Sequence, residues 1–237
     1  MSTRNARCPC GSGQKFKRCC AQLADTASAT ALADAAVGKR IQVWAAAHHR
    51  DALNAAWTQI TAGCDDALGD ADVQLIATWI FNDRELEGGG TAAELYSRLH
   101  GLDAEEREIA ARIAGARLGL MRVVRVVPGL WIELEDHTRQ DLVRVVSRGV
   151  SAHVSRGDMI VARRMDGPPT PSLWGPVGIV SADTGPSLSA LIEARIITLG
   201  LKDATDAVAK AMHSASMEVT ILLSPALRRP VLERRAA

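Results

Sequence analysis

The chain has 237 residues, of which 47% are hydrophobic and 23% charged, and its formal net charge is +1. These values are typical of a globular protein and exclude a disordered or fibrous chain. The sequence contains neither an apolar run of eighteen residues nor an apolar N-terminal stretch, so we expect no membrane insertion, no secretion and a cytoplasmic location.

Four of the five cysteines lie within the first twenty residues, at positions Cys8, Cys10, Cys19 and Cys20. Paired cysteines in a reducing compartment more often hold a metal than form disulfides. Four thiolates suffice for a closed tetrahedral zinc site, and the spacing alone also leaves metal-free thiols or disulfides open. Gly11 and Gly13 favour a sharp chain reversal between the cysteine pairs.

The same segment carries five basic residues and no acidic one, namely Arg4, Arg7, Lys15, Lys17 and Arg18. Positive charge around a site of four thiolates favours deprotonated sulfur and bound metal. The run Lys15, Phe16, Lys17 and Arg18 is the candidate partner-binding surface. Phe16 either covers the metal site or is exposed as an anchor for a partner.

Residues 1–22 resemble the SEC-C motif, first known from the C-terminal tail of the translocase ATPase SecA. The resemblance lies in Cys-x-Cys, the Gly-Ser-Gly turn, the basic and aromatic stretch and the final Cys-Cys pair. It implies a zinc knuckle with Cys8, Cys10, Cys19 and Cys20 as ligands, and contact with a protein or ribosomal partner. It implies no translocase activity, because the chain has no phosphate-binding loop.

Residues 21–30 are small and polar and are expected to form a linker or a lightly held continuation of the knuckle. Residues 31–120 then carry apolar residues at helical spacing, which predicts a bundle of roughly five helices. Thr91 and Asp103, each followed three residues later by Glu, predict helix starts, and the last helix is expected to run to Leu120. Trp44, Trp57 and Trp79 are expected in the core. His48, His49 and Cys64 receive no functional role.

Residues 121–183 contain runs of β-branched residues separated by turns, which predicts a small barrel of about five strands, SH3-like or OB-like. The expected strands are 123–127, 130–135, 141–146, 159–165 and 177–181. Five arginines are expected to point outward: Arg122, Arg125, Arg144, Arg163 and Arg164. Val127-Pro128-Gly129 and Gly157-Asp158 also loosely resemble segments of other bacterial proteins that carry SEC-C.

Residues 184–237 are expected to form a helical C-terminal segment, with helices after Gly185 and from about Asp203. Residues 217–223 fit either a helix or a strand. The arginines at 228, 229, 234 and 235 are expected at a solvated end. The fold class is therefore α+β, in four parts: 1–22, 31–120, 121–183 and 184–237.

Function follows mainly from the cysteine segment. The leading hypothesis is a cytoplasmic, zinc-binding adaptor that contacts a protein or ribosomal partner. The alternative is a nucleic-acid-binding protein that uses the basic segment and the barrel. An enzyme is not expected, because neither a nucleophile elbow nor a His-Glu-x-x-His helix is present.

Overall fold

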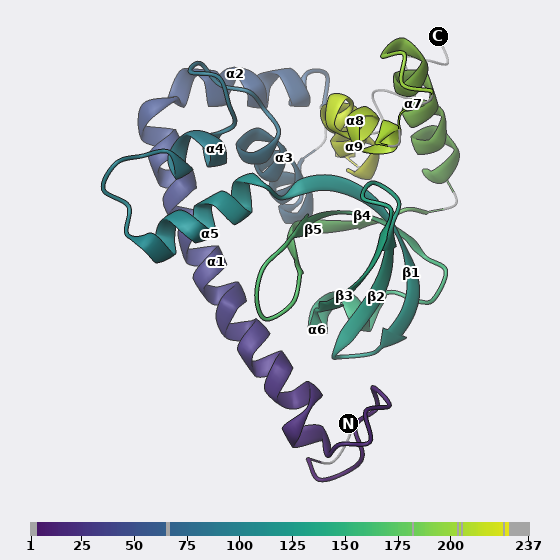
Figure 1. Ribbon diagram of the computed structural model, residues 1–237. Coiled ribbons are helices and arrows are strands. Elements are labelled where there is room, and N and C mark those ends of the chain that lie inside the picture. Colours follow the sequence, from purple (N-terminus) through teal and green to yellow (C-terminus); the bar gives the residue numbers. More distant parts are fainter. Residues whose placement is uncertain are drawn as a thin grey trace.

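The computed structural model describes residues 4–64, 67–181, 183–202, 204, 206–224 and 226–227. The fold is α+β. Helices α1–α5 precede one antiparallel sheet in the sequence, α6 lies between its third and fourth strands, and α7–α9 follow it (Figure 1). The elements are η1 (Phe16–Arg18), α1 (Cys20–His48), α2 (Arg50–Thr61), α3 (Asp70–Asn82), α4 (Ala92–Ser97), α5 (Ala104–Ala114), β1 (Arg117–Val127), β2 (Trp131–Asp136), β3 (Asp141–Val146), α6 (Arg148–His153), β4 (Met159–Met165), β5 (Ser172–Ile179), α7 (Gly185–Thr198), α8 (Ala207–Ser214) and α9 (Ser216–Leu223).

Helix α1 is one 29-residue helix that begins within the cysteine segment. Residues 21–30 form its first turns, so the expected linker is wrong. The reason is local: this stretch is rich in Ala, the strongest helix former, and contains neither Gly nor Pro. Figure 1 shows the helix running from the cysteine segment at one end of the molecule to the other helices at the opposite end.

The helices α1, α4 and α5 enclose one core, whose buried members include Ile41, Tyr96 and Ile113. The two predicted helix starts are confirmed. The Thr91 hydroxyl accepts from the Glu94 N–H at 3.3 Å, and the Asp103 carboxylate accepts from the Glu106 N–H at 2.8 Å. The described chain stays helical only to Ala114, and β1 begins at Arg117, so the expected helix to Leu120 is wrong.

The helices α2 and α3 form a second core with α9. Trp79 is buried there, and its indole N–H donates to the Ser216 hydroxyl at 3.2 Å. Trp44 and Trp57 are partly buried against the helical cores, which agrees with the expectation for all three tryptophans. Cys64 packs against this second core as well.

The five strands form one antiparallel sheet in the order β3-β2-β1-β4-β5. The sheet does not close, so the expected barrel is wrong: β3 and β5 remain its two edges. A pocket of about 220 Å³ between these edges is lined by α1, the end of β3 and the Pro169–Pro171 loop. Helix α1 thus lies beside the end of β3 and the start of β5. Two strands also begin earlier than expected, β1 at Arg117 and β5 at Ser172.

Two of the five arginines that were expected to point outward are buried. Arg163 is 2% exposed and pairs with Asp83 at the end of α3, and Arg164 is 8% exposed and pairs with Asp136 and Asp141. Their charges are tolerated because carboxylates from other elements face them. Arg122, Arg125 and Arg144 are exposed, as expected.

The C-terminal helices cover the β1/β4 part of one sheet face. Leu118 and Val161 from these strands pack with Leu188, Met212 and Val219. Residues 217–223, left open between helix and strand, are helical within α9. The expected helix start at Asp203 and the expected solvated end at 228–237 lie outside the described residues. The division into four domains stays a prediction.

Candidate metal centre

A tight loop brings the two cysteine pairs together. The Cys8 N–H donates to the Gln14 carbonyl at 2.8 Å, and the Phe16 N–H donates to the Ala6 carbonyl at 2.9 Å, so the chain folds back on itself. Gly11 has φ +83° and Gly13 φ +73°, the left-handed region that favours glycine. The expectation that these glycines reverse the chain is confirmed.

The second cysteine pair lies where the short helix η1 meets α1. Cys19 caps α1, its carbonyl accepting from the Leu23 N–H at 3.1 Å, and Cys20 is the first helical residue. The N-terminus of a helix carries partial positive charge from its unpaired N–H groups. Both cysteines therefore lie at the positive end of the helix dipole.

The sulfur atoms of Cys8, Cys10, Cys19 and Cys20 all lie within 4.8 Å of one another. The Cys10 and Cys19 sulfurs are 3.5 Å apart. A tetrahedral ion with metal–sulfur bonds near 2.3 Å requires sulfurs about 3.8 Å apart. The donor set and its spacing therefore fit a four-coordinate metal ion. No second cluster of this kind occurs among the described residues, and His48 and His49 belong to none.

The thiol pKa values show why the cluster favours a cation. A hydrogen bond with the Ser12 hydroxyl lowers the pKa of Cys10 to about 6. The same hydroxyl lowers the pKa of Cys19, but burial and the neighbouring Cys10 and Cys8 sulfurs outweigh it and leave that pKa raised. Burial, then Cys8 and Cys10, raise the pKa of Cys20. Four thiolates this close repel one another, and a divalent cation removes that cost.

Residues 4–22 match the SEC-C motif. No curated protein and no solved structure matches the chain. The suspected resemblance to the SEC-C motif is therefore confirmed for residues 4–22, which we call the SEC-C knuckle.

The SEC-C knuckle is docked on the sheet. Cys8 and Cys20 form a buried cluster with Trp131, the first residue of β2, and Phe16 packs against this cluster together with Val127, Leu130 and Val146. Phe16 is therefore partly buried at the base of the knuckle and is not a free anchor. The β1–β2 turn supplies the surface on which the knuckle rests (Figure 1).

Two arginines flank the Trp131 ring. The guanidinium carbon of Arg144 lies 4.3 Å from the ring centroid and that of Arg125 lies 5.1 Å away, both within cation–π range. This arrangement is not predictable from the sequence, because Trp131 lies more than a hundred residues from the knuckle in a segment whose pattern predicts only a strand. Trp131 is the contact that sequence reasoning missed.

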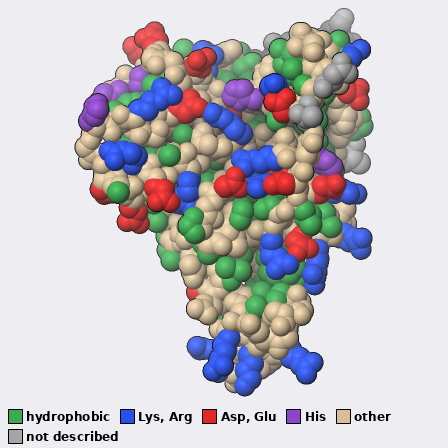
Figure 2. Space-filling view, viewed as in Figure 1, with side chains coloured by type: hydrophobic (Ala, Val, Ile, Leu, Met, Phe, Trp, Pro, Cys, Tyr) green, Lys and Arg blue, Asp and Glu red, His purple; other side chains and the backbone are tan. Residues whose placement is uncertain are grey.

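The cations of the knuckle remain in solvent. Lys15, Lys17 and Arg18 are exposed, as are Arg4 and Arg7, and none of these side chains forms an ion pair with the rest of the described chain. Figure 2 shows them as a group of Lys and Arg side chains at the tip of the molecule, with almost no acidic side chain beside them in this view. Of the candidate partner-binding residues, the three cations point outward and Phe16 does not.

None of the helices among the described residues is long and apolar enough to cross a membrane.

Proposed function

We propose that this protein is a cytoplasmic, zinc-binding adaptor without catalytic activity, and that its SEC-C knuckle contacts an acidic surface of a protein or ribosomal partner. The observation that carries the proposal is the four-sulfur cluster with an exposed cationic tip beside it. Zinc is the ion proposed because it accepts four thiolates tetrahedrally and has no redox chemistry.

The closed ligand set supports a structural role for the metal. With four protein sulfurs bound, zinc has no open position for a substrate or an activated water. The metal would then fix the loop, and the loop would hold Lys15, Lys17 and Arg18 without an ion pair to any carboxylate of the described residues. Unpaired cations in a fixed arrangement favour rapid, salt-sensitive association with an anionic surface.

Co-purification from a cell lysate tests the proposal. The triple variant Lys15→Glu, Lys17→Glu, Arg18→Glu should lose the partners that the parent chain retains at low salt. The control reverses Arg50 and Arg156, two exposed arginines away from the knuckle, and should retain those partners. Identical partners for the parent and the triple variant would rule out the knuckle as the contact.

Nucleic-acid binding is the second candidate, favoured by Arg125 and Arg144 beside the knuckle. Two observations weigh against it: Arg144 is paired with Glu133 at 2.5 Å, and Trp131 is only 1% exposed and cannot stack on a base. A labelled RNA oligonucleotide measured by fluorescence anisotropy decides the matter. Binding that weakens steeply with salt would support this candidate, and absent or salt-insensitive binding would exclude it.

A further inference from the structure

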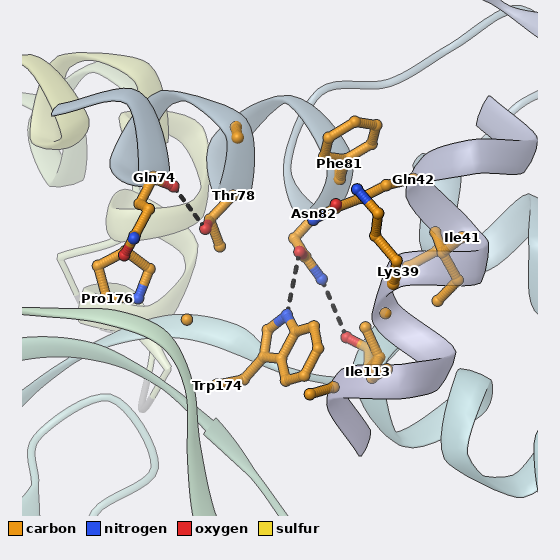
Figure 3. A pocket seen from close by; sticks show the side chains of 15 residues that line it. Lys39, Ile41, Gln42, Gln74, Thr78, Phe81, Asn82, Ile113, Trp174 and Pro176 are labelled. Carbon is orange, nitrogen blue, oxygen red and sulfur yellow. Dashed lines mark hydrogen bonds between the residues drawn. The ribbon is translucent and has the colours of Figure 1, made fainter. Parts of the chain in front are cut away.

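A pocket of about 390 Å³ lies between α1, α3 and β5. It is far from the SEC-C knuckle, because its first α1 residue, Ala35, is fifteen residues and about 22 Å along the helix from Cys20. Helix α1 contributes Lys39 and Gln42, helix α3 contributes Phe81 and Asn82, and β5 contributes Trp174 (Figure 3). The volume is in the range of small-molecule sites.

The aromatic wall of this pocket is held in place from two sides. The Trp174 indole N–H donates to the Asn82 side-chain oxygen at 3.2 Å. On the other side the ring lies against Gly38 of α1, where a Cβ would come within 2.4 Å of the ring carbon Cη2. Trp174 is thus positioned before any ligand arrives, which lowers the entropy cost of binding.

The polar groups of the pocket favour an anion. Lys39 is the one formally charged side chain among the described residues that line it, and it forms no ion pair with them. Asn82 is 4% exposed and donates one N–H to the Ile113 carbonyl at 3.2 Å. Its second N–H has no acceptor among the described residues. In Figure 3 the Lys39 side chain extends from α1 toward α3, the helix that carries Asn82.

Apart from Gln42, Gln74 and Thr78, the remaining lining is apolar and suits a flat ring. Phe81, Ile113 and Pro176 line the pocket together with Trp174, and Thr78 already donates its hydroxyl hydrogen to the Gln74 carbonyl at 2.7 Å. We propose that this pocket binds a small aromatic monoanion, with the ring against Trp174 and the anionic group on Lys39 and the Asn82 N–H. One lysine balances one negative charge, so a carboxylate matches the site.

The probe is 2-naphthoate, titrated into the full-length protein and followed by the NMR signal of the Trp174 indole N–H, assigned with a Trp174→Phe variant. A dissociation constant on the order of 1 mM is expected for a ligand of this size. The neutral match, 2-naphthamide, should bind at least about threefold more weakly, since it lacks the charge that Lys39 attracts. Equal binding of the amide, or no shift with naphthoate, would overturn the proposal.

Matched variants distinguish binding in the pocket from nonspecific binding elsewhere on the protein. Lys39→Gln should weaken naphthoate about threefold and Lys39→Glu about tenfold, because an exposed ion pair is worth little and a like charge repels. Arg50→Gln is the charge control. Ala35→Trp fills the pocket from α1, whereas Ala36→Trp places the same bulk on an exposed α1 residue outside it. Binding that survives Ala35→Trp and Lys39→Glu would refute the site.

Discussion

Trp131 and Cys20 belong to one buried cluster at the junction between the SEC-C knuckle and the sheet, with exposed fractions of 1% and 5%. One is the first residue of β2 and the other the first residue of α1. A metal ion bound by the four sulfurs would therefore do more than fold the first residues of the chain. It would also fix the surface that the sheet covers, so loss of the ion should change the environment of Trp131.

Metal content should depend on the four clustered cysteines. Cys20→Ser replaces a sulfur ligand by a poor one, and we expect at least about a 100-fold loss in zinc affinity, measured by competition with a chromogenic chelator. Cys64→Ser is the control, because Cys64 lies outside the cluster. Stoichiometric zinc in the Cys20 variant, or none in the parent chain purified under reducing conditions, would contradict the ligand set.

Removal of the metal should expose Trp131. A chelator that strips the ion allows the thiolates to repel one another and loosens the knuckle from β2, so tryptophan emission should shift to longer wavelength and acrylamide quenching should increase. Trp131→Phe should abolish that response and leave the emission of the remaining tryptophans unaltered. An unchanged spectrum in the parent chain after verified loss of metal would show that docking is independent of the ion.

The buried ion pair between Arg163 and Asp83 joins the sheet to the helices, and the side chains are 2% and 1% exposed. Arg163→Met should cost about 3–5 kcal/mol in the free energy of unfolding, because Asp83 is left as a buried charge without its partner. The double variant Arg163→Met, Asp83→Leu should recover most of that loss in urea denaturation. A double variant no more stable than the single one would mean that the pair is not the cause.

Gly38 is required for the approach of Trp174 to α1. Gly38→Ala should lower the free energy of unfolding by about 1–3 kcal/mol, since the new Cβ would lie 2.4 Å from the indole ring. The matched control is Gly149→Ala in α6, where a Cβ meets nothing within 4 Å; it should be neutral or stabilise by up to about 1 kcal/mol. Thermal melts of the two variants compare these effects directly.

Glu106 gives a pH-dependent contribution to stability. The Tyr96 hydroxyl donates to it at 2.7 Å and Arg40 donates at 2.6 Å, and these contacts, Tyr96 first, lower the pKa of the Glu106 carboxyl. A lowered acid pKa stabilises the fold above the ordinary value of about 4.3 and the effect is lost as the pH falls through the lowered value.

The Glu106→Gln variant tests that contribution. It should be about 1 kcal/mol less stable than the parent at pH 7, and this deficit should be smaller at pH 3, as measured by urea denaturation at both values. Glu105→Gln, at an exposed neighbouring position, should change little at either pH. A deficit at pH 3 as large as at pH 7 would show that the carboxylate charge is not the source.

Local sequence determined the parts of the structure that depend on near neighbours. Gly11 and Gly13 reverse the chain because few other residues adopt positive φ, and Thr91 begins α4 because its hydroxyl and the Glu94 carboxylate satisfy N–H groups within three residues. The linker predicted for residues 21–30 is wrong because these residues form no apolar stripe that would indicate a helix, although their intrinsic helix propensity is high. The helix predicted to Leu120 is wrong because Ala116 and Leu120 continue the helical spacing of Ile113 by chance. From Arg117 on the chain is strand β1, in which Leu118 and Leu120 pack on the same side.

The sequence by itself determined the SEC-C knuckle, its four cysteines and its basic charge, because a cysteine cluster built from thirteen consecutive residues is specified by local spacing. Only the tertiary structure decided that the sheet stays open, that Arg163 is buried against Asp83, and that Trp131 receives the knuckle. Each of these features depends on residues far apart in the chain. Their pairing is set by the packing of whole helices and strands, and it produces no periodic pattern in the sequence of either partner.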